Sequence, residues 1–202
     1  MKIAVYCHSI APSIDGVCRR FTAILNELVR HGHDVILFTM EDDPEDLPEL
    51  TAIYTIPHFL MPAYPDKKVA KIDFETLRII FSALRHHRPD VIHCTADGIA
   101  QAFAMAGIFL GIPCVASFHT DILDLLKSHN ANWFQKFCVV FKERVDSVVL
   151  DSCATTSKSF SKKLAIQGLN CEHIIITGVD SHMFTPRKRR PELRHELLFG
   201  NS

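Results

Sequence analysis

Short apolar strands and amphipathic helices alternate along this chain from its first residues. Apolar residues at helical spacing, such as Phe21, Ile24, Leu25 and Leu28, predict helices, and continuous apolar runs between them predict buried strands. This alternation is typical of a doubly wound α/β chain, in which helices cover both faces of a parallel sheet. The expected strands cover residues 2–7, 35–38, 52–56, 89–93, 113–118, 147–150 and 173–176, and the expected helices 16–30, 70–87, 97–110, 131–145 and 156–167.

Function in such a sheet is expected in the loops that follow the strands, because ligands bind outside the carboxyl ends of parallel strands. The segment 57–65 contains Pro57, Pro62 and Pro65 and is expected to be a loop. Together these loops cover residues 8–15, 39–50, 57–65, 94–97, 119–130 and 151–156.

The composition is that of a globular protein. The chain has 202 residues, which is enough for one sizeable core, and its formal net charge of −1 excludes a globally basic nucleic-acid-binding protein. Seven cysteines without a CxxC pair indicate reduced thiols in a cytoplasmic protein rather than a disulfide framework. Met1 and Lys2 lead directly into an apolar strand, so no signal peptide is expected. Gly111 and Pro113 interrupt the uncharged stretch 98–118, so no transmembrane helix is expected either.

The first candidate site lies at the start of the helix expected over residues 16–30. Asp15 and Gly16 stand at its amino terminus, and Arg20 follows about one turn later. Free N–H groups at a helix amino terminus bind anions such as phosphate, and a glycine lets a ligand approach the backbone closely. An ordinary turn glycine is the alternative. The loop matches neither the dinucleotide-binding G-x-G-x-x-G pattern nor a P-loop.

A second candidate site follows the strand expected over residues 113–118. His119 and Asp121 could hydrogen-bond a sugar or phosphate, or relay a proton, whereas the alternative is a histidine that only caps the strand. The Ser and Thr residues of segment 151–157 favour a helix cap over a phosphate contact. The twelve histidines include no HExxH pattern, so no metal site is expected.

Three segments bear on partners. In the helix 131–145, basic residues accompany four aromatic residues, Trp133, Phe134, Phe137 and Phe141. Packing of these aromatic side chains in the core is the default expectation. The alternative is that they dock on an anionic membrane, together with the leucines that precede the helix. The basic run 187–190 is expected to be a solvated linker, with contact to anionic lipid or another domain as the alternative. The acidic run 41–49 is expected to be a solvated loop.

Five motifs, taken in order, resemble the amino-terminal half of glycosyltransferase family 4. The match covers roughly residues 1–190 and is most similar to lipid-directed enzymes such as sulfoquinovosyl-diacylglycerol synthases and phosphatidylinositol mannosyltransferases. The motifs are Pro12-Ser13-Ile14-Asp15-Gly16-Val17, Gly32-His33-Asp34-Val35, Pro89-Asp90-Val91-Ile92-His93, Phe118-His119-Thr120-Asp121, and Gly178-Val179-Asp180 through Phe184-Thr185-Pro186.

The resemblance implies one Rossmann-like half of a GT-B fold. Residues 1–180 would form the acceptor domain, and residues 181–202 a basic linker toward a donor half that this sequence lacks. The implied activity is the retaining transfer of a sugar from a nucleotide-sugar, UDP- or GDP-linked, to a lipid or glycan acceptor, with no metal or other cofactor. Peripheral contact with a membrane stays an alternative that rests on the aromatic and basic helix 131–145 and on Leu123, Leu125 and Leu126, and nucleic acid is not expected as a partner.

The resemblance also implies roles for individual residues. Gly16 is expected near the donor phosphates, and His119 is expected beside the transferred sugar as the catalytic residue. The expected substrate-binding residues are Asp15, Gly16, Val17, Arg20 and Asp121. The first loop departs from many family members in having one glycine where they have two.

In the family, a donor half would come next and contribute a phosphate-binding Arg or Lys and a Glu-x7-Glu pair, and this sequence is expected to lack that half. Cationic groups of this kind stabilise a leaving nucleotide diphosphate, so little or no transfer is expected from this chain alone. The alternative is a non-catalytic binding module, or a subunit that pairs with a separate donor-half chain. An oxidoreductase is disfavoured because no G-x-G-x-x-G follows the first strand.

Overall fold

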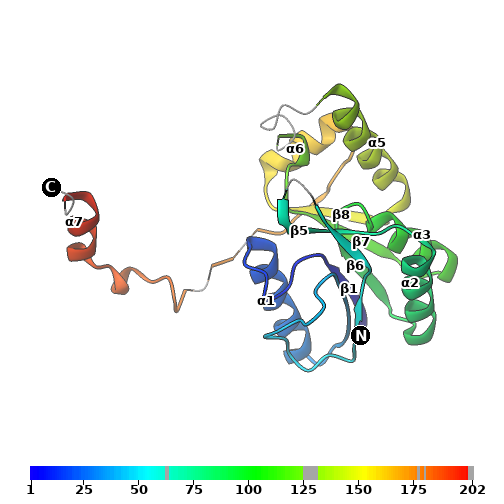
Figure 1. The fold of residues 1–202 in the computed structure, drawn as a ribbon, viewed down its shortest axis with the longest axis horizontal. Helices are drawn as coiled ribbons and strands as arrows, with labels where there is room; N and C mark the ends of the chain where they lie inside the picture. Colours follow the sequence, from blue (N-terminus) through cyan, green and yellow to red (C-terminus); the bar gives the residue numbers. More distant parts are fainter. Residues whose placement is uncertain (62–63, 125–131, 177, 180, 200–202) are drawn as a thin grey trace.

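A seven-stranded parallel sheet forms the centre of the fold, as the alternating pattern predicts (Figure 1). The computed structural model describes residues 1–61, 64–124, 132–176, 178–179 and 181–199. The strand order is β3-β2-β1-β6-β7-β8-β9. Successive strands are added on one side of β1 up to β3 and on the other side from β6 onward, so the strand order reverses between β1 and β6. The strands are β1 (Lys2–Cys7), β2 (Asp34–Thr39), β3 (Ala52–Thr55), β6 (Val91–Thr95), β7 (Cys114–Phe118), β8 (Ser152–Thr155) and β9 (His173–Ile174).

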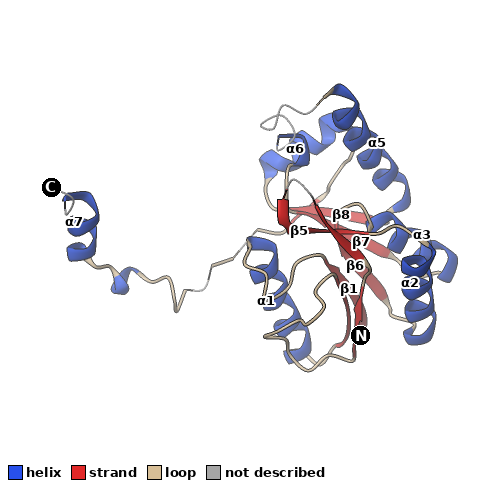
Figure 2. Ribbon diagram, in the orientation of Figure 1, coloured by secondary structure: helices blue, strands red, loops and turns tan. Residues whose placement is uncertain are grey.

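Helices cover both faces of this sheet, which confirms the doubly wound arrangement (Figure 2). On one face, Phe21 of α1 packs in a core with Val5 and Leu37. On the other, Phe103 of α3 stacks on Tyr6, with ring centroids 5.1 Å apart. Alternate residues of each strand thus serve opposite cores. The helices are α1 (Gly16–Arg30), α2 (Phe74–His87), α3 (Ala100–Leu110), α5 (Trp133–Val149), α6 (Lys158–Gln167) and α7 (Pro191–Phe199).

The strand predicted over residues 147–150 is wrong, because α5 continues to Val149 and strand β8 begins at Ser152. Lys142 pairs with Asp146 at 2.6 Å, one helical turn apart, and Gln101 donates to the same carboxylate at 2.9 Å. Asp146 is fully buried. These contacts hold the last turns of α5 in the helix despite β-branched residues that favour a strand.

An antiparallel hairpin replaces the loop predicted over residues 57–65. It consists of β4 (His58–Met61) and β5 (Tyr64–Ala70), so α2 begins at Phe74 and not at residue 70. Lys68 Nζ lies 2.7 Å from Glu41 Oε2 and donates to the carbonyl oxygen of Met40 at 3.0 Å. Glu41 is only 7% exposed, so the acidic run is not solvated throughout its length.

The aromatic side chains of α5 are exposed, so core packing, the default expectation for them, is wrong. Trp133 is 77% exposed, and Phe134, Phe137 and Phe141 are each more than half exposed. Among the residues that the structure describes, no helix has both the length and the apolar content needed to cross a membrane. Leu125 and Leu126, two of the leucines that precede α5, and Asp180 of the last motif lie outside the described residues.

The carboxyl-terminal segment leaves the sheet and runs away from it (Figure 1). It contains a short 3-10 turn (Pro186–Lys188) and then helix α7, whose described side chains are all exposed. All seven cysteines are free thiols, and six of them are buried.

Candidate functional site

Two adjoining cavities lie at the carboxyl ends of the central strands, where the strand order reverses. The α1 cavity, of about 400 Å³, lies over the start of helix α1. The hairpin cavity, of about 320 Å³, lies between the β4–β5 hairpin and the loops after β6 and β7. His8, His119 and Thr120 line both cavities. This is the position at which open parallel sheets bind ligands.

The α1 cavity brings together five of the residues named from the sequence: Asp15, Gly16, Val17, Arg20 and His119. Asp15 caps the helix, since its Oδ1 accepts hydrogen bonds from the backbone N–H groups of Val17 at 2.9 Å and Cys18 at 2.8 Å. Two of the N–H groups at the helix start are therefore already satisfied by a carboxylate. Gly16 keeps the approach open, because no atom lies within 4 Å of the place where a Cβ would stand.

Arg20 supplies the positive charge of the α1 cavity. Its Nη2 donates to the carbonyl oxygen of Ile175, just beyond β9, at 2.8 Å. This bond ties the guanidinium to the far edge of the sheet and holds it at the rim of the cavity. The fixed guanidinium and the open backbone at Gly16 suit an anionic group such as a phosphate, which would lie beside the Asp15 carboxylate that caps the helix.

His119 extends from the end of β7 between the two cavities. Ser117 Oγ lies 2.8 Å from His119 Nε2 and 3.0 Å from His93 Nε2, so one hydroxyl links the two imidazoles. Burial, followed by the charge of Arg20, lowers the pKa of His119 to about 4. The imidazole is therefore neutral at neutral pH, and the Ser117 contact fixes the orientation of its ring.

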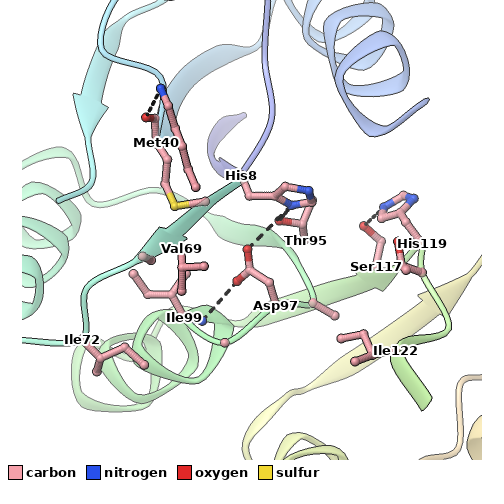
Figure 3. A pocket seen from close by; sticks show the side chains of 15 residues that line it. His8, Met40, Val69, Ile72, Thr95, Asp97, Ile99, Ser117, His119 and Ile122 are labelled. Carbon is pink, nitrogen blue, oxygen red and sulfur yellow. Dashed lines mark hydrogen bonds and ion pairs between the residues drawn. The ribbon is translucent and has the colours of Figure 1, made fainter. Parts of the chain in front are cut away.

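The hairpin cavity has apolar sides and a polar end, as Figure 3 shows. Asp97 lies at the polar end, where its Oδ2 accepts a hydrogen bond from the Tyr6 hydroxyl at 2.8 Å. His8 Nδ1 lies 3.7 Å from the same oxygen and 3.2 Å from Thr95 Oγ1. The apolar sides are formed by Met40, Val69, Ile72, Ile99 and Ile122.

The sequence predicts function in the loops that hold Asp97 and His8 but does not point to either residue. Asp97 lies two residues after the end of β6, and His8 directly follows β1. β1 and β6 are the two strands between which the strand order reverses. That position is the signal that could have identified both residues.

Asp121 is not among the residues that line these two cavities. Its carboxylate pairs with Lys163 of α6 at 2.9 Å and accepts a hydrogen bond from the backbone N–H of Asp124 at 3.0 Å. In segment 151–157, Ser157 caps α6 as expected, through a hydrogen bond from the Phe160 N–H at 3.2 Å, and Thr156 lines the α1 cavity. Within the described ranges, no group of three or more His, Cys, Asp or Glu side chains could hold a metal ion.

Residues 14–156 match the model of Glycosyltransferase Family 4. Over 96% of its length, the chain is 24% identical to the GDP-mannose-dependent alpha-mannosyltransferase of Mycobacterium tuberculosis, of which it covers 52%. It is 28% identical to the sulfoquinovosyl transferase SQD2 of Arabidopsis thaliana, over 93% of this chain and 37% of that protein. It is 23% identical to the alpha-monoglucosyldiacylglycerol synthase of Streptococcus pneumoniae, over 98% of this chain and 44% of that protein.

Solved structures show the same fold. The Anabaena protein Alr3699/HepE, in complex with UDP-glucose, superposes with a TM-score of 0.60 at 16% identity, over 100% of this chain and 51% of that one. The chain thus spans about half the length of the proteins that it matches.

Proposed function

This chain belongs to glycosyltransferase family 4, and from this premise we propose that it is the acceptor half of a retaining transferase that moves a sugar from a nucleotide-sugar to a membrane lipid. The fold is that of one half of a GT-B enzyme. The observation that carries the proposal is the shared wall of His8, His119 and Thr120 between a cavity suited to an anion and a cavity with apolar sides.

Each cavity suits one substrate. The start of α1 and Arg20 favour the diphosphate of the donor, with Gly16 admitting it to the backbone. The relatives' names include a GDP-mannose-dependent enzyme, and the Anabaena structure holds UDP-glucose, which supports a donor linked to GDP or UDP. His119 is then the catalytic residue, a neutral imidazole that hydrogen-bonds the transferred sugar where the two substrates meet. The diacylglycerol named for the pneumococcal relative supports a lipid acceptor.

The experiment uses the protein as cells make it. An antibody against residues 1–180 would recover the native polypeptide for mass determination and for assay with radiolabelled UDP-glucose and GDP-mannose. We expect label to enter the lipid extract from one of these donors. We expect His119→Ala to reduce transfer about a hundredfold, as the loss of a group that stabilises the transition state does. Folded wild-type protein that transfers neither sugar would contradict the proposal.

The same purification tests the alternative of a non-catalytic module or a subunit. Residues 1–202 expressed alone are expected to transfer little or no sugar, because the groups that stabilise the leaving diphosphate belong to the family's donor half. Recovery of one longer polypeptide supports the acceptor-domain proposal. Recovery of a 202-residue chain with a second polypeptide supports the subunit alternative.

We also propose that the protein binds the surface of the membrane peripherally, through α5. Its aromatic face exposes Trp133, Phe137 and Phe141, and the adjoining α3 exposes Phe109 at 74%. Arg144 is exposed on α5 and Lys136 is half-buried there. Exposed aromatic side chains beside cations are typical of helices that lie in the interface of an anionic bilayer.

Trp133 is the only tryptophan of the chain, so its fluorescence reports on this face alone. We expect a blue shift of its emission, and flotation of the protein, with vesicles that contain phosphatidylglycerol. The variant Phe137→Ser/Phe141→Ser should lose both effects. The matched control Ile166→Ser, at an 86% exposed residue of α6, should keep them. Unchanged emission and no flotation at low salt would refute the membrane contact.

A further inference from the structure

The charges of the hairpin cavity discriminate between kinds of lipid acceptor. Apart from His8 and His119, its lining has two ionisable side chains, those of Lys68 and Asp97. Lys68 Nζ is 2.7 Å from Glu41 Oε2 and 3.8 Å from Asp42 Oδ2, so its charge is balanced by acids of the loop after β2. The acidic group that a ligand meets in this cavity is therefore the carboxylate of Asp97, with His8 Nδ1 3.7 Å from its Oδ2.

The Asp97 carboxylate is held in one orientation. Its Oδ2 accepts a hydrogen bond from the Tyr6 hydroxyl at 2.8 Å, and its Oδ1 accepts one from the Ile99 N–H at 3.1 Å. Tyr6 is fully buried and its ring stacks on Phe103, so the donor of the first bond is fixed as well. A carboxylate has about four acceptor sites, so two bonds leave room for donors from a ligand.

Asp97 remains accessible from the cavity, because 28% of its side chain is exposed. Figure 3 shows it between His8 and Ile99, with the apolar wall of Val69 and Ile72 beside it. Burial raises the pKa of Asp97, which indicates that the ionised carboxylate has fewer stabilising contacts here than in water. Hydroxyl donors from a ligand would restore such contacts, whereas a phosphate would add a second negative charge.

The position of Asp97 relative to the reaction centre is also suitable. His8 Nδ1 lies 3.7 Å from Asp97 Oδ2, and His8 lines both cavities together with His119. A hydroxyl group bound at Asp97 therefore lies on the side of the hairpin cavity that adjoins the α1 cavity. An alkyl chain attached to it would extend along the apolar wall.

We propose that Asp97 is a specificity-determining residue, which accepts a hydrogen bond from the acceptor and selects uncharged polyol lipids, such as diacylglycerol or neutral glycolipids, over lipids with a phosphate head group. This inference rests on the proposed function, because it assigns the acceptor of the same transfer. It concerns only the hairpin cavity and requires no chemical step beyond that transfer.

The test is a binding measurement on residues 1–202, which contain the whole cavity. Calorimetric titration would compare n-octyl glucoside, below its critical micelle concentration, with dihexanoyl phosphatidylinositol. We expect the wild-type chain to bind the uncharged glucoside about tenfold more tightly. The glucoside gains a charge-assisted hydrogen bond to Asp97, and it avoids the repulsion between this carboxylate and a phosphate. Asp97→Asn keeps the side-chain shape and removes the charge, so it should abolish this preference.

Two further variants make the result specific. Glu172→Gln removes an exposed carboxylate that does not line the cavity, and it should leave the preference unchanged. Ile72→Ser alters the apolar wall at a side chain that is 65% exposed, and it should weaken binding of both probes. Equal or tighter binding of the phosphatidylinositol, an unchanged preference in Asp97→Asn, or no binding of either probe would each overturn the proposal. The proposed function fails separately, if the protein recovered from cells transfers no sugar.

Discussion

Two glycines of this chain tolerate a methyl group very differently, and the contrast tests the α1 cavity. A Cβ at Gly16 would meet no atom within 4 Å, whereas a Cβ at Gly107 would lie 2.5 Å from the carbonyl oxygen of Ile112. We expect Gly16→Ala to change the free energy of unfolding by less than about 0.5 kcal/mol. We also expect it to weaken nucleotide-sugar use by about tenfold or more, because the methyl group occupies the approach to the helix start. Thermal melting and the transfer assay on protein recovered from cells measure the two effects.

Gly107→Ala is the matched control, and the close contact at that position predicts a loss of about 1–3 kcal/mol. If Gly16→Ala lowers the melting temperature as much as Gly107→Ala does, then Gly16 has a structural role. If Gly16→Ala leaves transfer unchanged, no substrate approaches the backbone there.

Individual side chains show how far the sequence predicts the site. The pattern identified the loops that matter, because strand ends can be read from apolar runs. It could not tell which carboxylate faces a cavity: Asp15 caps α1, Asp121 pairs with Lys163, and Asp97, which was not named, lines the hairpin cavity. The Asp15 cap is a local contact, whereas the roles of Asp121 and Asp97 depend on contacts between segments that are distant in the sequence.

At the scale of elements, the shortest of the ion pairs that join the β4–β5 hairpin to the loop after β2 is that of Lys68 with Glu41. Lys68 Nζ lies 2.7 Å from Glu41 Oε2, and Ser13 Oγ donates to Glu41 Oε1 at 2.7 Å. Glu41 is 7% exposed, so Glu41→Gln leaves the cation of Lys68 without its main partner. We expect a loss of about 1–2 kcal/mol and faster hydrogen exchange of the β5 amides, measured by mass spectrometry.

A double-mutant cycle with Lys68→Met separates the pair from its surroundings. The double variant should be less destabilised than the sum of the single variants, because no uncompensated charge remains. Additive effects, together with unchanged exchange in β5, would show that this ion pair does not hold the hairpin.

The two elements that the sequence predicts wrongly have physical explanations. Prolines at 57, 62 and 65 mark turns and predict a loop, although proline is compatible with edge strands. Val148 and Val149 favour a strand, whereas the buried Asp146 holds the end of α5 in the helix. In both places a tertiary contact opposes the local preference: Lys68 with Glu41 at the hairpin, and Gln101 with Asp146 at α5.

At the scale of the whole molecule, the sheet and its two helical layers followed from the alternation alone. Parallel strands need crossover helices, and right-handed crossovers put those helices on opposite faces when the strand order reverses. The reversal between β1 and β6 could not be read from the sequence, since it depends on which strands pair. It determines the site, because the loops after these two strands meet there.

Global stability should depend on pH through Glu143 of α5. This side chain is 5% exposed, and burial is the main cause that raises its pKa from 4.5 to about 7. The folded state therefore holds this proton more tightly than the unfolded state does. The contribution of Glu143 to stability is full below about pH 4.5 and is lost as the pH rises through about 7. We expect the free energy of unfolding to fall by about 1–2 kcal/mol over this range, a value that includes the screening of the charge by water.

The measurement compares the melting temperatures of the wild type and of variants of residues 1–202 between about pH 5 and pH 8.5. The difference between wild type and variant isolates the titration of Glu143 from that of the other ionisable groups. Glu143→Gln should melt about 4 °C above the wild type at the alkaline end, and the difference should shrink toward pH 5. Glu172→Gln removes an exposed carboxylate by the same substitution and should follow the wild type throughout. A Glu143→Gln profile parallel to the wild type would show that Glu143 is already ionised at neutral pH, and that its neighbours on α5 and α6 stabilise the charge.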